Sequence, residues 1–180
     1  MKKNILLGIS GGIAAYKCCE LVRTLVKKGF QVKVVMTEHA KEFVSPLTFR
    51  TLSGHPVFSD MFGENLSSAM PHISLSKESD IMVVAPATAN IIAKTVHGFA
   101  DDLLSTLILS FKGKVLFAPA MNSNMYNNPI FQENLKLLKK YDKKYKIIGP
   151  EKGDLACGDE GIGRMSEVDT IIKALQNEIK

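Results

Sequence analysis

The most conspicuous candidate for chemistry is Cys157, which lies in the segment GDLACGDEGIGRM between Gly153 and Met165. Four glycines in this stretch disfavour both a helix and a packed strand, so we expect a flexible loop. A thiol on such a loop is able to swing over a site, exclude water and deliver a proton. The alternative is a small apolar side chain that packs beneath the loop.

A second candidate is the stretch GISGGIAAYK, which places Ser10, Gly11 and Gly12 at a predicted turn from strand to helix. Backbone N–H groups in such a turn, supported by the helix dipole, bind phosphate. The spacing is not G-x-G-x-x-G, so a mononucleotide phosphate fits better than a dinucleotide. Thr37 adds a hydroxyl, whereas Glu38 keeps a dinucleotide enzyme open as an alternative. A glycine turn needed only for close packing of helix and sheet is the structural alternative.

Two further loops, APATAN and APAMN, follow the third and fourth predicted strands. Thr88, Asn90 and Asn122 supply short polar groups there, and the carboxamide of Asn122 donates hydrogen bonds to a carboxylate without adding charge. Each asparagine taken alone is more typical of a helix cap. Taken together, the loops indicate a crevice at the carboxyl edge of the sheet, where doubly wound folds bind ligands.

His72, in MPHISLSKESD, is the histidine best placed for proton transfer, although a lone histidine is more often structural. The other three histidines are weaker candidates. Asp159 and Glu160 lie too close to Cys157 in sequence to wrap around an ion. We therefore predict no metal site.

Five apolar runs alternate with helical patterns, which is typical of a parallel sheet with helices on both faces. The runs are Ile5–Ile9, Val32–Met36, Ile81–Ala85, Val115–Ala118 and Lys146–Ile148. At 180 residues and 46% hydrophobic composition, the chain is long enough for one full-sized core. We predict a single α/β domain, residues 1–180, with a doubly wound parallel sheet.

Helix signals are clearest near the two ends of the chain. In the first helix apolar residues recur at i, i+3, i+4, i+7 and i+8, namely Cys18, Leu21, Val22, Leu25 and Val26. This periodicity makes Cys18 a core residue. In the last helix we expect a capping box that starts at Ser166. Asp101 or Asp102 and the pair Asn128–Pro129 are expected to begin two intervening helices.

The formal net charge of +5 concentrates in six lysines between residues 136 and 146, which flank a predicted helix end. We interpret them as a solvated helix terminus, not a nucleic-acid site. No run approaches the roughly 18 apolar residues of a membrane span, so we expect no membrane association. Cys18 and Cys19 are adjacent and the cysteine count is odd, which argues against a disulfide framework and favours a cytoplasmic location.

Five motifs occur in an order that resembles a known family: SGGIAAYK, PHISL, APATANIIAK, PAMNSNMYNNP and LACGDEGIGRM. They are similar to the phosphopantothenoylcysteine decarboxylases of coenzyme A biosynthesis, a branch of the flavin-containing cysteine decarboxylases. The resemblance spans essentially the whole chain. It implies a flavodoxin-like fold, FMN at a subunit interface, and homotrimers that sometimes assemble into dodecamers.

The resemblance also implies roles for individual residues. The predicted contacts to FMN are Ser10, Gly11, Gly12, Ile13 and Thr37 around the phosphate, and Thr88, Ala89, Asn90, Ile91 and Ala120 around the flavin. The predicted contacts to the substrate are Met121, Asn122, Leu155 and Ala156. His72 would act in an oxidative half-reaction, and Cys157 would be the acid of a reductive half-reaction.

The implied reaction removes CO₂ from a cysteine whose nitrogen is held in an amide. A hydride leaves the cysteinyl CH₂–S carbon for FMN, CO₂ departs, and the hydride then returns with a proton from Cys157. The implied substrate is a phosphorylated small molecule. Because the chain ends at Lys180, we expect the synthase activity of longer bacterial relatives to lie on another chain.

Two residues depart from the family pattern: Tyr126 stands where a tryptophan is expected, and Asp154 places an acid near an anionic substrate. The first puts a packing detail in doubt, and the second is unexpected unless the side chain points away. Two other functions stay open. One is a peptidyl-cysteine decarboxylase that acts on a peptide C-terminus, and the other is a non-catalytic regulatory flavoprotein.

Overall fold

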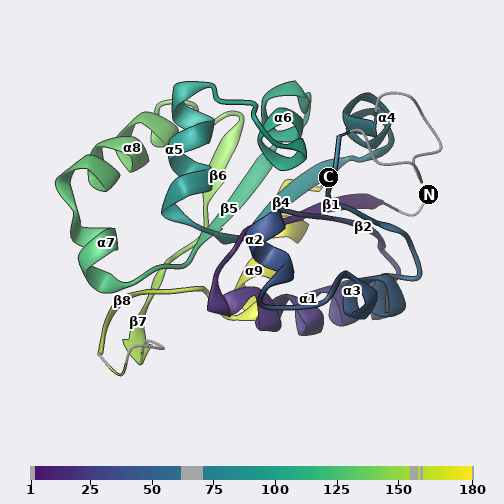
Figure 1. Cartoon of the computed structure of the whole chain (residues 1–180), viewed down its shortest axis with the longest axis horizontal. Coiled ribbons are helices and arrows are strands. Elements are labelled where there is room, and N and C mark those ends of the chain that lie inside the picture. The colour runs from purple at the N-terminus through teal and green to yellow at the C-terminus, as the bar shows by residue number, and fades with distance from the viewer. Residues whose placement is uncertain (1–2, 62–70, 155–157, 159, 180) are drawn as a thin grey trace.

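The computed structural model describes residues 3–61, 71–154, 158 and 160–179. A six-stranded sheet in the order β3-β2-β1-β4-β5-β6 forms its centre, and every pair of neighbours is parallel (Figure 1). The strands are β1 (Asn4–Ile9), β2 (Gln31–Met36), β3 (Val57–Phe58), β4 (Ile81–Ala87), β5 (Val115–Pro119) and β6 (Tyr145–Ile147).

The five predicted apolar runs are confirmed as strands β1, β2, β4, β5 and β6. Numbered among themselves, they have the order 2-1-3-4-5, which is the flavodoxin-like order. The short strand β3 was not predicted and pairs with the outer edge of β2. The direction of winding reverses between β1 and β4, so the sheet has its topological switch point there.

Helices cover both faces of the sheet (Figure 1). The first face is covered by α1 (Lys17–Lys27), α3 (Pro46–Ser53) and α9 (Val168–Glu178). The second face is covered by α4 (Pro71–Glu78), α5 (Ala89–His97), α6 (Leu103–Ser110) and α8 (Pro129–Lys139). Three short helices lie at the carboxyl edge of the sheet: η1 (Ile13–Tyr16), α2 (Glu38–Lys41) and α7 (Ser123–Asn127).

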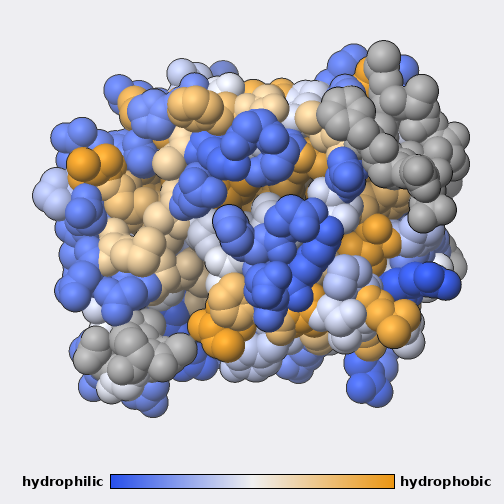
Figure 2. Space-filling view, in the orientation of Figure 1, coloured by the Kyte–Doolittle hydropathy of each residue, from blue (hydrophilic) through white to orange (hydrophobic). Residues whose placement is uncertain are grey.

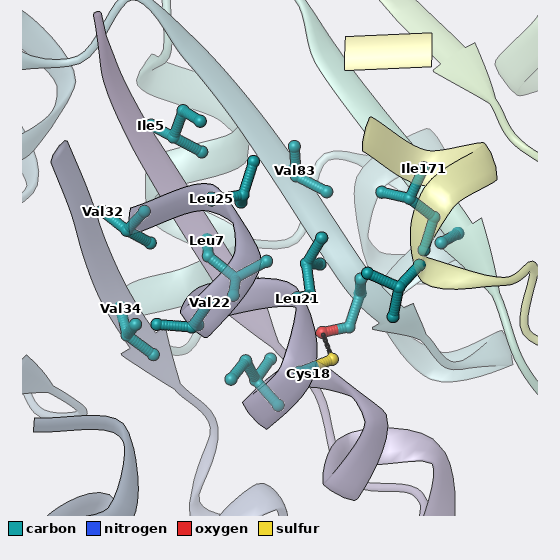
Figure 3. Close-up of a cluster of buried hydrophobic side chains, with 14 of the residues drawn as sticks. Ile5, Leu7, Cys18, Leu21, Val22, Leu25, Val32, Val34, Val83 and Ile171 are labelled. Carbon is teal, nitrogen blue, oxygen red and sulfur yellow. Dashed lines mark hydrogen bonds between the residues drawn. The ribbon is translucent and has the colours of Figure 1, made fainter. Parts of the chain in front are cut away.

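The core forms because successive side chains of each buried strand point to opposite faces. In β1, Ile5 and Leu7 pack beneath α1, whereas Leu6 packs on the other face. Figure 3 shows Cys18 among these side chains, with its Sγ donating to the carbonyl oxygen of Ala85 at 3.0 Å. Burial, and secondarily the neighbouring Cys19, raise the pKa of the Cys18 thiol above its ordinary value. The prediction that Cys18 is a core residue is confirmed.

Helix ends agree with the sequence in part. Asp102 forms a capping box with Ser105, and Asn128 caps α8, as predicted. The capping box at Ser166 is wrong, because α9 begins at Val168 and the Ser166 hydroxyl is buried, with no hydrogen-bond partner among the described residues. Val26, the last residue of the apolar pattern in α1, is 36% exposed and lies at the edge of the apolar face.

An antiparallel hairpin lies apart from the main sheet and consists of β7 (Glu151–Asp154) and β8 (Glu160–Arg164). The prediction that this glycine-rich segment is not a strand is therefore wrong for these residues. Backbone pairing needs no side chain, and Gly153 lies opposite Gly161 in the register. Cys157, Leu155 and Ala156 lie outside the described residues.

Among the helices that the structure describes, none combines the length and apolar character that a membrane span requires.

Candidate functional site

Two cavities of about 870 and 400 Å³ lie at the carboxyl edge of the sheet. They share Gly11, Thr88, Ala89 and Met125 along their walls. Most of their remaining walls come from the segments that follow β1, β2, β4 and β5, which converge at the topological switch point. The β7–β8 hairpin and Glu167 complete the larger cavity, and Lys94 and Asp102 complete the smaller one. The crevice predicted from the sequence is thus present, and it is continuous over both cavities.

The predicted ligand residues divide between the cavities. Those at the larger cavity are Gly11, Gly12, Ile13, Thr88, Ala89, Ala120, Met121 and Asn122. Those at the smaller cavity are Ser10, Gly11, Thr37, Thr88, Ala89, Asn90 and Ile91. The fold therefore brings the predicted ligand residues of four separate loops to one edge of the sheet.

Ser10 joins two of these loops. Its Oγ donates to the carbonyl oxygen of Pro86 at 2.7 Å and accepts from the backbone N–H of Thr88 at 3.0 Å. Ser10 is only 2% exposed. Its hydroxyl therefore holds the turn after β1 against the loop after β4, and the backbone of the turn is left to contact a ligand.

Gly11 is required by the close approach of α2. A Cβ at this position would lie 2.4 Å from Cβ of His39 and 2.9 Å from its carbonyl carbon. A Cβ at Gly12, in contrast, would have only Cγ2 of Thr88 within 4 Å, at 3.7 Å. Gly11 thus permits the packing of helix on turn, while the absence of a side chain at Gly12 keeps the cavity open.

Two threonines cap the helices that begin at the smaller cavity. Thr37 Oγ1 accepts from the backbone N–H of Ala40, and Thr88 Oγ1 accepts from that of Ile91. The cap of α5 is therefore Thr88, not Asn90. Because the first N–H groups of a helix lack intrahelical partners, these helix starts direct N–H donors and positive dipole ends toward an anion.

Lys94 is the one lysine among the residues that line the smaller cavity. Its Nζ lies 2.7 Å from carboxylate oxygens of both Asp101 and Asp102. Burial would lower the pKa of Lys94, but these two hydrogen-bonded carboxylates outweigh it and raise that pKa. The positive charge is thus already compensated, so this cavity offers a ligand mainly hydroxyls and N–H groups.

The loop after β5 carries Asn122, whose Oδ1 accepts from the backbone N–H of Asn124 at 2.8 Å and caps α7. This contact fixes which end of the carboxamide faces the helix. Met121 donates its N–H to the carbonyl oxygen of Gly163 in β8 at 2.9 Å. The hairpin is therefore tied to the loop that holds Asn122. Tyr126 packs against Phe131, with ring centroids 5.9 Å apart.

Apolar side chains on the rim of the larger cavity are unusually exposed. Ile13, Tyr16 and Met125 are 56%, 58% and 49% exposed. Figure 2 shows weakly hydrophobic surface on this face over α7 and between it and α5. The small side chains of Ala89 and Ala120, together with these apolar groups, leave room for a flat ring. The helix N-termini at the smaller cavity suit a phosphate.

His72 does not line either cavity. It lies in the first turn of α4, which Figure 1 places at the opposite end of the molecule from α7 and the β7–β8 hairpin. A single chain therefore does not bring His72 to Asn122. Cys157, Leu155 and Ala156 lie outside the described residues, so the structure does not place them.

Three charged residues of the larger cavity were not predicted from the sequence: Lys17, Arg164 and Glu167. Lys17 and Arg164 both form ion pairs with Glu167. Lys17 and Arg164 lie within two of the five motifs, but Lys17 is far from Glu167 in the chain, so no local pattern predicts that these two side chains meet.

Comparisons with known proteins agree with this architecture. The Flavoprotein family model matches residues 1–180. The probable phosphopantothenoylcysteine decarboxylase of Streptococcus mutans is 45% identical over 99% of this chain and 100% of its own length. The coenzyme A biosynthesis bifunctional protein CoaBC of Vibrio cholerae is 49% identical over 97% of this chain, which spans only 43% of that protein.

Two solved structures have the same fold. A PPC decarboxylase mutant complexed with pantothenoylaminoethenethiol has a TM-score of 0.88 and 29% identity, with 98% of both chains covered. The FMN-dependent cysteine decarboxylase SpaF has a TM-score of 0.83 and 26% identity, over 99% of this chain and 98% of its own. The predicted flavodoxin-like fold is confirmed, and the chain belongs to the Flavoprotein family.

Proposed function

We propose that the protein is an FMN-dependent carboxy-lyase that converts 4'-phosphopantothenoylcysteine to 4'-phosphopantetheine in coenzyme A biosynthesis, with residues 1–180 as its decarboxylase domain. One observation carries the proposal: the glycine turn, the Thr88 loop and the Asn122 loop meet along one continuous crevice. The full-length relative from Streptococcus mutans supports the choice of substrate.

FMN fits the crevice as it is built. At the smaller cavity, N–H and hydroxyl groups of Gly11, Thr37, Thr88, Asn90 and Ile91 would surround its phosphate. Gly12, Ile13, Ala89 and Ala120, which line the larger cavity, would border the ring. This division assigns Thr88, Asn90 and Ile91 to the phosphate and not to the ring, because they line the smaller cavity. Ser10 would act through its backbone, because its hydroxyl holds the Pro86–Thr88 loop. Bound FMN supplies a reversible acceptor for a hydride from the carbon next to sulfur.

Asn122 would bind the substrate carboxylate through a neutral amide. A cation in its place would stabilise the carboxylate before CO₂ leaves and so raise the barrier, whereas an amide orients the group with a smaller ground-state penalty. The N-cap bond to Asn124 holds the carboxamide in a fixed orientation. Cys157 as the proton donor, with Leu155 and Ala156 beside the substrate, remains part of the proposal.

His72 leads to a proposal about assembly. Because His72 is far from Asn122 within one chain, it would act at the crevice of another copy, in a homotrimer or in a dodecamer built from trimers. The exposed Ile13, Tyr16 and Met125 on the cavity rim are the apolar groups that such an interface would bury. A cytoplasmic location remains a prediction from cysteine usage.

The decisive test is incubation of the FMN-loaded protein with 4'-phosphopantothenoylcysteine, following the mass loss of CO₂. A peptide that ends in cysteine is the matched second substrate. Decarboxylation of the peptide alone would favour a peptidyl-cysteine decarboxylase. Full flavin occupancy with neither product would favour a regulatory flavoprotein and refute the proposal.

The cofactor site has its own test, which compares Gly11→Ala with Gly12→Ala. Both variants are expected to retain less FMN, measured as bound flavin per chain. Only Gly11→Ala is expected to destabilise the cofactor-free protein, since its Cβ meets His39 at 2.4 Å. Wild-type flavin content in Gly12→Ala would show that the turn does not hold the cofactor.

A further inference from the structure

Lys17 and Arg164 are the two cations among the described residues that line the larger cavity. They reach it from different parts of the fold, since Lys17 begins α1 and Arg164 ends β8. Both contact the same carboxylate oxygen, Oε1 of Glu167, with Lys17 Nζ at 3.5 Å and Arg164 Nη2 in direct contact. The cluster therefore contains two positive charges and one negative charge.

The arrangement leaves both cations able to bind a further anion. A guanidinium has five N–H donors in a fixed fork, and the ion pair with Glu167 uses Nη2. At 3.5 Å the Lys17 ammonium is too far from Glu167 for a short charge-assisted bond. The Lys17 side chain is 17% exposed, so its charge is partly desolvated at the cavity wall.

The β7–β8 hairpin positions the side chain of Arg164. The Arg164 guanidinium reaches from β8 over β7 and packs on Gly153, where an added Cβ would lie 3.0 Å from Nη1 of Arg164. The neighbouring Gly163 is bonded to Met121 at 2.9 Å. The cation cluster is thus attached to the loop that carries Asn122, on the substrate side of the crevice.

Within the part of the chain that the structure describes, one other charged side chain lines this cavity, the carboxylate of Asp154 in β7. It lies at the end of the hairpin in register with Glu160, which pairs with Lys152 at 3.2 Å. An anion would be repelled from the Asp154 end and attracted to the Lys17 end. The positive charge of the cavity lining is therefore concentrated at Lys17 and Arg164.

We propose that Lys17 and Arg164, held together by Glu167, bind the terminal phosphate of the substrate and select phosphorylated over unphosphorylated substrates. The inference rests on the proposed function. A phosphomonoester dianion matches two converging cations, and an arginine fork suits its oxygens.

The other phosphomonoester in the system, that of FMN, is better matched by the smaller cavity. Lys17, Arg164 and Glu167 line the larger cavity alone, whereas the helix starts at Thr37 and Thr88 border the smaller one. The substrate carboxylate, in turn, is matched by the neutral Asn122. Each anionic group thus has a separate place in the crevice.

The test uses the FMN-loaded enzyme with two substrates, 4'-phosphopantothenoylcysteine and unphosphorylated pantothenoylcysteine. We expect Arg164→Gln and Lys17→Gln each to lower kcat/KM for the phosphorylated substrate by about 10- to 100-fold, the effect of losing a charged hydrogen bond. For the unphosphorylated substrate, kcat/KM is expected to change by less than about twofold, because the group that these side chains bind is missing.

Lys152→Gln is the matched control. It removes one positive charge from the same hairpin, but Lys152 does not line the cavity and its side chain is 73% exposed. We expect it to leave both kcat/KM values unchanged. Asp154→Asn is expected to improve kcat/KM for the phosphorylated substrate about two- to fivefold, since it removes a repulsive charge.

Three outcomes would overturn the inference. Equal losses for both substrates would mean that the cations support the structure, and a fall in bound flavin per chain would mean that they hold the cofactor phosphate. A wild-type enzyme that decarboxylates both substrates equally well would show that the phosphate is not recognised, while the proposed function would stand.

Binding of the phosphorylated product, measured calorimetrically against unphosphorylated pantetheine, tests the site without turnover. We expect the wild type to bind the phosphorylated product more tightly and Arg164→Gln to lose this difference. Equal affinities would overturn the inference even in a protein that decarboxylates neither substrate, an outcome that would separately refute the proposed function.

Discussion

The contact between Gly163 and the Asn122 loop makes Gly163→Ala the most informative single substitution. Gly163 has φ of +142°, where L side chains are strained, and an added Cβ would lie 2.2 Å from the carbonyl oxygen of Met121. To reach even 3.0 Å, the hairpin and the loop must separate by about 0.8 Å. The hydrogen bond from Met121 N–H to Gly163, now 2.9 Å, then stretches or breaks.

The free-energy cost of keeping the hairpin docked in the variant has two parts, backbone strain and the loss of this hydrogen bond. Backbone strain of this kind costs about 1–3 kcal/mol, and loss of a backbone hydrogen bond costs about 0.5–1.5 kcal/mol. Together they give roughly 2–4 kcal/mol against the docked hairpin. Because the strain disappears when the hairpin detaches from the Asn122 loop, we expect the variant to open locally at this contact and not to lose global stability to the same extent.

Hydrogen exchange at the Met121 amide measures that opening, and kcat/KM measures its effect on the substrate. We expect Gly163→Ala to lower the protection factor of this amide about 30-fold or more, because a cost of about 2 kcal/mol changes the opening equilibrium by that factor. We also expect it to lower kcat/KM. Gly98→Ala is the matched control, since Gly98 also has positive φ but no atom within 4 Å of an added Cβ. If Gly163→Ala kept both the Met121 protection and kcat/KM of the wild type, the coupling would be refuted.

Three further predictions concern stability and reactivity. Asp102→Ala is expected to lower the free energy of unfolding by about 1–2 kcal/mol, and to lower Tm more than Asp101→Ala does in thermal denaturation. Both carboxylates pair with Lys94, but only Asp102 caps α6. Equal shifts in Tm for the two variants would contradict this. Hydrogen bonds from two lysines lower the pKa of Glu178 below its ordinary value of 4.5, so its stabilisation is present above pH 4.5 and lost as pH falls through the lower folded pKa. In urea unfolding, the stability advantage over Glu178→Gln should therefore shrink below pH 4.5, and a pH-independent difference would contradict this. Cys18, fully buried with a raised pKa, is expected to react with a thiol reagent only after unfolding, and rapid native labelling at this position, mapped by mass spectrometry, would contradict the fold.

The main sheet was predictable because β1, β2, β4 and β5 are short, mainly apolar runs between helical patterns, and the three-residue β6 has the next place in the same alternation. The β7–β8 hairpin was not, since Glu151–Asp154 and Glu160–Arg164 lack alternating apolar residues and pair through their backbones. The two-residue strand β3 carries too little pattern to be found. Ser166 has the spacing of a cap, but packing against Gly149, where an added Cβ would lie 2.2 Å from its Oγ, buries it.

The crevice was predictable for a geometric reason: the loops after parallel strands share one edge of the sheet, so Gly11, Thr88 and Asn122 converge whatever their side chains do. The pairing of Lys17 with Glu167 depends instead on side chains that meet across the fold, and no spacing encodes it. His72 illustrates the same limit, because the sequence motif names a residue without saying that the fold places it away from both cavities.

The two ends of the crevice differ in how they would hold an anion, and this has a consequence for salt dependence. At the smaller cavity Lys94 is compensated by two carboxylates, so a phosphate there is held by directional N–H and hydroxyl donors. At the Lys17 end of the larger cavity two cations outnumber Glu167, while Asp154 balances the charge at the other end, so the attraction is local, acts between charges and is screened by ions. Raising ionic strength should therefore lower kcat/KM for the phosphorylated substrate while bound flavin per chain stays constant. Flavin loss that parallels the fall in kcat/KM, in a titration with sodium chloride, would contradict this division between a directional cofactor site and an electrostatic substrate site.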